Sequence, residues 1–213
     1  VPFGSADRNA GDPLTVMPYP GGRHPRIGFL DGAVRPQRET KLSVFAPWDR
    51  RSYVVCDFPE AIWSDLGLNY LAHTHIDTIW SRDGIELEPR EWRRTPHATW
   101  LTERTLPDGL KFGTEALALE DQVAFRMWLI NGSDSPRSDL RVQNCVMLKG
   151  ADGFDQQTDD NKIYRGRLCA CGDPTRRRWV IVGWEPIDRA WGNPPRPCLH
   201  ADPKFPDCEP GAR

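Results

Sequence analysis

Short stretches in which apolar and polar residues alternate recur along most of the chain, separated by turn residues. The clearest covers residues 122–130, where the apolar side chains fall on one face of an extended strand: Val123, Phe125, Met127 and Leu129. Residues 110–119 form another such stretch, and a polar pair at 120–121 separates the two. This arrangement predicts a β-hairpin with its apolar face in the core.

The same patterning predicts several further strands and almost no helix. We expect these strands at 41–48, 52–58, 68–80, 97–106, 139–149 and 178–184. Residues 60–67 follow a proline and predict one helical turn, whereas residues 150–168 are polar and predict a long loop. Because no long amphipathic helices alternate with the strands, the pattern favours an all-β fold, an antiparallel β-sandwich or jelly roll, over a parallel α/β fold.

The length and composition of the chain are consistent with one domain. At 213 residues the chain can bury a sizeable core, and its 20 prolines and 18 glycines indicate long loops between short strands. Residues 1–40 are rich in glycine, proline and arginine and lack periodicity, so we expect an irregular arm packed on the domain. Residues 41–213 are expected to form the single β-sandwich domain, which ends in a loop rich in proline and cysteine.

Charge and hydropathy argue against several classes of partner. The net charge is only −2, and residues 176–178 are the one tight basic cluster, so no extended surface for a nucleic-acid backbone is predicted. No apolar run reaches membrane-spanning length, and we therefore expect no membrane partner. The chain does not begin with a signal peptide, and we expect a secreted or periplasmic protein from which one has been removed.

The six cysteines leave the redox compartment open. Cys56 and Cys145 lie within apolar strand patterns, which favours core packing for both. Cys198 and Cys208 bracket a proline-rich segment, where a disulfide would close a loop that few hydrogen bonds can stabilise. The alternative is a structural zinc site, for which soft ligands are available at Cys169, Cys171, Cys198, His200 and Cys208.

The most distinctive chemical pattern is the pair His73 and His75, followed by Asp77. On a strand, residues two apart share a face, so both imidazoles and the carboxylate would converge on one point. A third imidazole is expected from His200, because a disulfide and prolines would hold its segment rigid, with His97 as the reserve. This ligand set predicts one divalent transition metal ion, Zn²⁺, Cu²⁺, Fe²⁺ or Mn²⁺. The alternative is that the two histidines form hydrogen bonds with neighbouring strands.

The His-x-His element resembles the first motif of cupins, metal-binding β-barrels that place two histidines on one strand. The resemblance covers only residues 73–75. Cupins continue with a glutamate a few positions later, where this chain has Trp80 and Ser81, and no second cupin motif follows. The chain is therefore not assigned to that family.

The outward positions of two predicted strands carry guanidinium, indole and amide groups: Arg126, Trp128, Arg141 and Gln143. We expect these groups to share one sheet face. Aromatic rings beside amide and guanidinium groups suit the apolar faces and hydroxyls of sugars. Trp80 would add to an aromatic wall near the histidines. The alternative is an ordinary solvent-facing sheet, on which long side chains cover the aromatic rings.

These patterns lead to two hypotheses about function. The first is a metal-dependent carbohydrate-active enzyme that cleaves a polysaccharide or oligosaccharide by lyase-type or oxidative chemistry. In this enzyme Asp77 acts as a ligand or base, Tyr70 is one candidate for proton exchange, and Arg126 neutralises an acidic sugar. The second is a noncatalytic carbohydrate-binding module that uses the face carrying Trp128 and Gln143.

Overall fold

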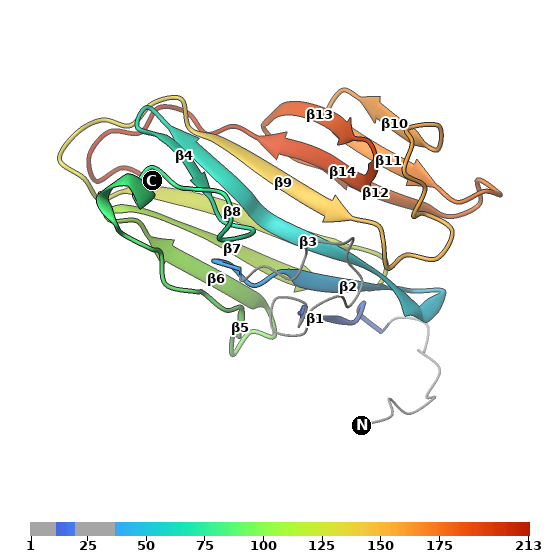
Figure 1. Ribbon diagram of the computed structural model, residues 1–213. Coiled ribbons are helices and arrows are strands. Elements are labelled where there is room, and N and C mark those ends of the chain that lie inside the picture. Colours follow the sequence, from blue (N-terminus) through green and yellow to red (C-terminus); the bar gives the residue numbers. More distant parts are fainter. Residues whose placement is uncertain (1–11, 20–36) are drawn as a thin grey trace.

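The computed structural model describes residues 12–19 and 37–213, and the strands in this part of the chain all pair antiparallel. They form three sheets, of which the two larger ones are packed together (Figure 1). The one helix of the described part is the short 3-10 helix η2 (Ser81–Asp83), so no helix there is long and apolar enough to cross a membrane. The predicted antiparallel all-β fold is confirmed.

The largest sheet has seven strands, six of which follow one another across the sheet. In spatial order these are β1 (Val16–Pro18), β2 (Leu42–Ala46), β3 (Asp49–Ser64), β9 (Arg141–Met147), β14 (Arg196–Pro203) and β13 (Ile187–Asn193). The seventh strand, β4 (Gly67–Tyr70), pairs with the last part of β3. Because β14 lies between β9 and β13, the C-terminal part of the chain occupies the interior of this sheet.

The second sheet has four strands in sequence order and supplies the opposite wall of the core. Its strands are β5 (Arg93–Arg94), β6 (Trp100–Thr105), β7 (Leu110–Ala118) and β8 (Val123–Asn131). The continuous ladder between β7 and β8 confirms the predicted hairpin. Its apolar face points inward as expected, and the rings of Phe125 in β8 and Phe58 in β3 meet edge to face with centroids 4.6 Å apart.

A smaller sheet of three strands lies beside β13 and β14, at the right-hand end of Figure 1. Its strands are β10 (Lys162–Arg165), β11 (Leu168–Gly172) and β12 (Trp179–Gly183). Cys169 of β11 belongs to the main core, and Val180 and Val182 of β12 pack against that core. Trp184, just after β12, meets the ring of Phe58 edge to face at 5.5 Å between centroids.

The helical turn predicted at 60–67 is wrong, because β3 continues as far as Ser64. Ala61 and Ile62 are buried and pair with β4 on one side and β9 on the other. Pairing with two neighbouring strands therefore overrides the local signal of Pro59, which lies within β3.

The irregular segments predicted at 150–168 and after residue 184 are also wrong in part. β10 lies within the first segment, and β13 and β14 form most of the second. β14 lacks the usual alternation because polar side chains are buried on it along with apolar ones: Cys198, His200 and Asp202. A strand buried on both faces carries little hydrophobic periodicity.

The predicted irregular arm at 1–40 is described only in part, since residues 1–11 and 20–36 lie outside the described residues. Within it, residues 16–18 form β1, which pairs with β2 and extends the large sheet. That piece of the expected arm is therefore a regular strand.

A buried ion pair connects residues 38–39 to the four-stranded sheet. The Arg104 guanidinium of β6 contacts the Glu39 carboxylate, and both side chains are almost completely buried. Arg104 Nη2 also donates hydrogen bonds of 2.8 Å to the carbonyl oxygens of Arg38 and Glu88. Removing one member of such a pair is costly because the other charge stays buried without its partner.

We expect Glu39→Ala to lower the free energy of unfolding by about 3–5 kcal/mol, because Arg104 would be left buried and uncompensated. Glu103→Ala is the matched control, because Glu103 precedes Arg104 in β6 and its two partners, Arg93 and Lys111, are 59% and 42% exposed. Both cations stay in contact with water when the carboxylate is removed, so its loss should cost less than about 1 kcal/mol. Urea unfolding of both variants measures the difference, and equal losses would contradict the role given to the buried pair.

Candidate functional site

A row of polar and aromatic side chains crosses four strands of the large sheet. Asp57 of β3 pairs with Cys145 of β9, the β9–β14 register places His200 opposite Cys145, and Trp191 of β13 pairs with His200. Lys41 forms a buried ion pair with Asp57 at one end of this row. Side chains adjacent in sequence belong to the core and therefore point to the other face: Cys56, Val146 and Leu199.

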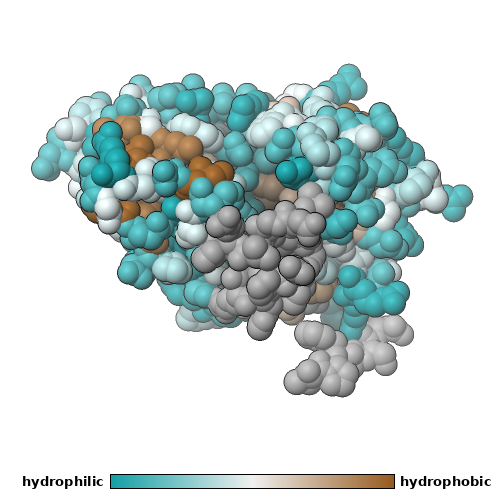
Figure 2. Space-filling model, viewed as in Figure 1, coloured by the Kyte–Doolittle hydropathy of each residue, from teal (hydrophilic) through white to brown (hydrophobic). Residues whose placement is uncertain are grey.

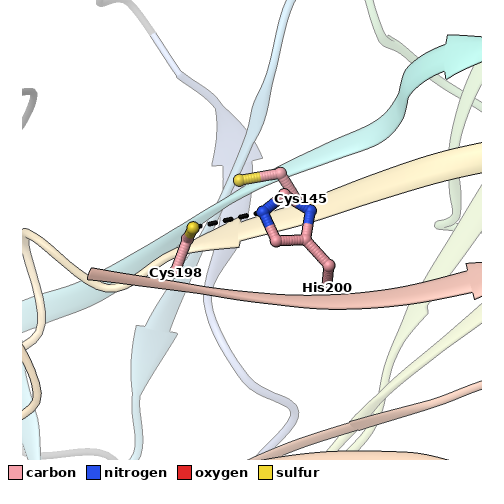
Figure 3. Close-up of side chains that lie close together, drawn as sticks. All are labelled: Cys145, Cys198 and His200. Carbon is pink, nitrogen blue, oxygen red and sulfur yellow. Dashed lines mark hydrogen bonds between the residues drawn. The ribbon is translucent and has the colours of Figure 1, made fainter. Parts of the chain in front are cut away.

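Cys145, Cys198 and His200 form a compact cluster, which we call the Cys/His site (Figure 3). Cys198 precedes His200 by two residues on β14 and shares its face, while Cys145 reaches the cluster from β9. Their sulfur and ring nitrogen atoms all lie within 4.8 Å of one another, and the described residues contain no second group of three such side chains this close. The exposed fractions are 4%, 2% and 2%, so the site is buried.

The orientation of the His200 ring is fixed from three directions. Its Nδ1–H donates a 2.8 Å hydrogen bond to the carbonyl oxygen of Asn144, and its Nε2 lies 3.2 Å from Cys198 Sγ. The ring stacks on Trp191 with centroids 4.0 Å apart, and the Trp191 indole N–H donates a 2.7 Å hydrogen bond to the Asp202 carboxylate. The imidazole therefore presents Nε2 to the two sulfur atoms.

The charges of the site are coupled. A hydrogen bond from Cys145, together with the hydrogen bond and charge of His200, lowers the pKa of Cys198 to about 5 against the opposing effect of burial. The pKa of Cys145 is raised well above the ordinary thiol value, because the Cys145 thiol donates a hydrogen bond to Cys198 and is buried. Burial works against a charged His200, but contact with Cys198 outweighs it and raises the pKa of the imidazole. These shifts favour a thiolate at Cys198 beside a charged imidazole at His200, with Cys145 as the neutral hydrogen-bond donor.

Glu60 is the nearest carboxylate on the Nδ1 side of His200, with Oε2 at 3.7 Å from that nitrogen. Gln143 donates a 2.8 Å hydrogen bond to Glu60, and the Tyr70 hydroxyl donates one of 3.1 Å. Burial and the nearby charge of Asp57 raise the pKa of Glu60. Two site residues predicted from the sequence, Tyr70 and Gln143, therefore lie beside the Cys/His site. Their hydrogen bonds go to Glu60 and not to the sulfur atoms of the site.

The strand predicted through His73 and His75 is wrong, because β4 ends at Tyr70 and both histidines lie in the loop before η2. The buried Arg38 guanidinium explains the loop: its Nη1 donates to carbonyl oxygens of residues 70, 73 and 76 at 2.8, 2.9 and 2.8 Å. These carbonyls point at one group instead of at a neighbouring strand. The two imidazole rings lie 5.6 Å apart, and neither belongs to the cluster that contains His200.

The segments on either side of the histidine loop carry exposed apolar side chains. Figure 2 shows hydrophobic side chains gathered at the upper left, where Figure 1 places β4. Leu66 and Ile85 are exposed in this part of the chain, and Trp80 is half-buried against the core. Asp77 is exposed in the same loop, and neither it nor Trp80 belongs to the Cys/His site.

The expectation that the outward groups of β8 and β9 share one face is also wrong, because β8 and β9 belong to different sheets. Arg126 in β8 pairs with Glu115 at 2.7 Å on the outside of the four-stranded sheet, together with Trp128. Arg141 in β9 forms its ion pair with Asp139 at 2.9 Å. The two strands are consecutive in the sequence, and residues 132–140 carry the chain from one sheet to the other, a change that the strand patterns themselves do not reveal.

The disulfide predicted between Cys198 and Cys208 is not formed, and all six cysteines are buried and free of disulfides. Cys208 packs in a separate part of the core, where its Sγ lies 3.4 Å from the Ala212 carbonyl oxygen. Cys56 is a core residue as expected. Cys145 is the site residue that sequence reasoning missed, although its strand position, two after the outward residue Gln143, was a signal that it faces away from the core.

Comparisons with protein-family models, curated proteins and solved structures found no match.

In the metal-free protein, we expect the thiolate absorbance of Cys198 to persist as the pH falls and to disappear in a transition near pH 5, where the thiolate takes up a proton. His200→Gln should shift this transition to higher pH, because the charged imidazole no longer stabilises the thiolate. Ultraviolet titration measures the transition, and Cys198→Ser identifies the signal by removing it. A wild-type transition at the ordinary thiol pKa, unchanged in His200→Gln, would contradict the ion pair.

Proposed function

We propose that this protein binds one transition metal ion at the Cys/His site, with Zn²⁺ as the first choice. The ligands are the Sγ atoms of Cys145 and Cys198 and the Nε2 atom of His200. The observation that carries the proposal is the convergence of these three atoms within 4.8 Å inside the protein. Bond lengths of about 2.3 Å to sulfur and 2.0–2.1 Å to nitrogen place tetrahedral ligand atoms about 3.5–3.8 Å apart, so only small side-chain shifts are needed.

The surroundings of His200 support this proposal. Histidines that bind metals usually donate their second ring N–H to a carbonyl or carboxylate oxygen, which fixes the tautomer. The Nδ1 bond to Asn144 does this and leaves Nε2 as the metal ligand. The low pKa of Cys198 also supports it, because a thiolate is the form that binds metal.

The donor set narrows the choice of ion expected from the sequence. Metal binding releases the protons of Cys145 and of His200 Nε2, because only the deprotonated groups are ligands. The resulting two thiolates and one imidazole favour Zn²⁺ or copper over Mn²⁺, which prefers oxygen ligands. Three protein ligands leave one tetrahedral position for water or a substrate, an arrangement typical of zinc sites that polarise bound oxygen atoms. The proposal is metal binding alone, since the carbohydrate chemistry expected from the sequence required His73, His75 and Asp77 beside His200, and none of the three belongs to the cluster that contains His200.

We expect dialysed protein loaded with Zn²⁺ to retain about one ion per chain. Cys198→Ser and His200→Gln should lose this ion, while Cys208→Ser and His75→Gln, which replace the same residue types outside the site, should keep it. Elemental analysis gives the stoichiometry, and the spectrum of Co²⁺-loaded protein reports thiolate ligation. Circular dichroism establishes that each variant is folded.

Two results would overturn the metal proposal. One is folded wild-type protein that retains no Zn²⁺ or Co²⁺ after dialysis. The other is retention that His75→Gln abolishes and His200→Gln leaves unchanged, which would place the metal in the loop after β4.

Carbohydrate binding without catalysis is a second candidate function, favoured by the position of Trp128. Its ring lies over Gly113 of the neighbouring strand, where a Cβ atom would collide with the indole. The charged groups of Lys111 and Arg213 lie over the ring, 5.4 and 5.3 Å from its centroid. A sugar that stacks on this half-buried indole would therefore displace both side chains from the ring, and their charged groups could then donate hydrogen bonds to its hydroxyls.

If this surface binds glycans, soluble polysaccharide in a native gel should slow the migration of the wild-type protein. Trp128→Ala should then migrate freely, because the aromatic platform is lost. Trp63→Ala is the control, since Trp63 lies in β3 of the other sheet, beneath Arg141. Equal retardation of both variants would rule out the Trp128 surface, without bearing on the metal site.

A further inference from the structure

A cleft of about 630 Å³ runs along one side of β12. Every residue from Trp179 to Trp184 lines this cleft, including neighbours whose side chains point to opposite faces of the sheet. No residue of β10 or β11 lines it. The cleft therefore follows the backbone edge of β12 that faces away from β11. Its opposite walls are mostly apolar and come from other parts of the fold: Val44, Phe45, Trp48, Phe58, Phe125 and Val146.

The edge of β12 that faces this cleft is paired with no other strand of the described residues. Among the described residues β12 pairs only with β11, and the amide of Trp184 donates to the Arg167 carbonyl oxygen on that side at 3.3 Å. Amides alternate in direction along an antiparallel strand, so those of Ile181 and Gly183 point away from β11. Both residues line the cleft.

The sequence of β12 lacks three features that commonly protect an edge against strand addition: charged residues, proline and a β-bulge. Residues 179–183 include no charged residue and no proline, and the β11–β12 register contains no bulge. Ile181 is 63% exposed, more than any other large apolar residue in the described part of the chain. Natural sheets usually blunt such edges, and an apolar edge left open is a template for another strand.

The charges around the cleft distinguish its two ends. Arg177 and Arg178 are exposed directly before β12, and the Arg178 guanidinium lies 5.5 Å from the ring centroid of Trp48, which lines the cleft. At the other end, Glu185 follows β12 and pairs with Arg167. The end next to Arg177 and Arg178 is therefore the positive one, and it complements acidic residues.

We propose that this cleft is a docking groove for an extended segment of a partner protein, which adds to β12 as a further strand. The segment carries apolar side chains at alternate positions, which enter the cleft, and acidic residues at the end beside Arg177 and Arg178. The backbone bonds provide affinity and the apolar walls select the side chains. This inference is independent of metal and carbohydrate binding.

The probe is a fluorescein-labelled synthetic peptide of alternating valine and serine that ends in two aspartates, measured by fluorescence anisotropy. Ile181→Pro should weaken its binding about tenfold, because one outward amide donor is lost while the bonds to β11 are kept. Ile181→Thr keeps the amide and should bind within about twofold of the wild type. Arg177→Glu should weaken the binding of this peptide, but not the binding of a second peptide in which asparagines replace the two aspartates.

Amide hydrogen exchange provides a measurement that needs no variant: exchange at Ile181 and Gly183 should slow when the peptide is added. Three results would overturn the proposal. The first is no peptide binding, or equal binding by Ile181→Pro and Ile181→Thr. The second is tight binding of a small apolar dye in the cleft while the peptide does not bind. The third is dimerisation of the protein that Ile181→Pro abolishes, which would assign the edge to a second copy.

Discussion

The pairing of β14 with β9 is the constraint on which the Cys/His site depends. It places His200 opposite Cys145 and brings Cys198 onto the same face, two residues along the strand. A shift of one residue would turn His200 into the core and Leu199 out of it, because side chains alternate between the two faces of a sheet. The burial of Leu199 and Val146 in the core therefore fixes the register that assembles the site.

Burial then determines the chemistry of the three side chains. A thiolate and an imidazolium removed from water need each other's charge, and Cys145 supplies a further hydrogen bond. The ring of His200 cannot easily turn away, since the Asn144 carbonyl and the Trp191 ring hold it. A rigid, negatively charged sulfur beside a fixed ring nitrogen suits a soft cation, because binding requires the release of protons but little movement of the side chains.

Sequence patterns were sufficient for the fold class and for the hairpin of β7 and β8, where alternation is regular and each strand has one apolar face. They failed for β14, whose buried polar residues conceal the alternation and whose prolines, such as Pro197, suggest a loop. The strand predicted through residues 73 and 75 was wrong because of a residue that is distant in sequence. The buried guanidinium of Arg38 donates hydrogen bonds to the backbone carbonyl oxygens of residues 73 and 76, which holds them in a loop. His200 was identified as a candidate ligand from sequence, but its neighbour Cys145 required knowledge of which strands pair.

X-ray absorption spectroscopy of the Zn²⁺-loaded protein tests the central claim most directly. The account predicts a first shell with two sulfur atoms at about 2.3 Å and at least one imidazole nitrogen at about 2.0–2.1 Å. A first shell made only of nitrogen and oxygen atoms would contradict it, because neither Cys145 nor Cys198 would then hold the ion.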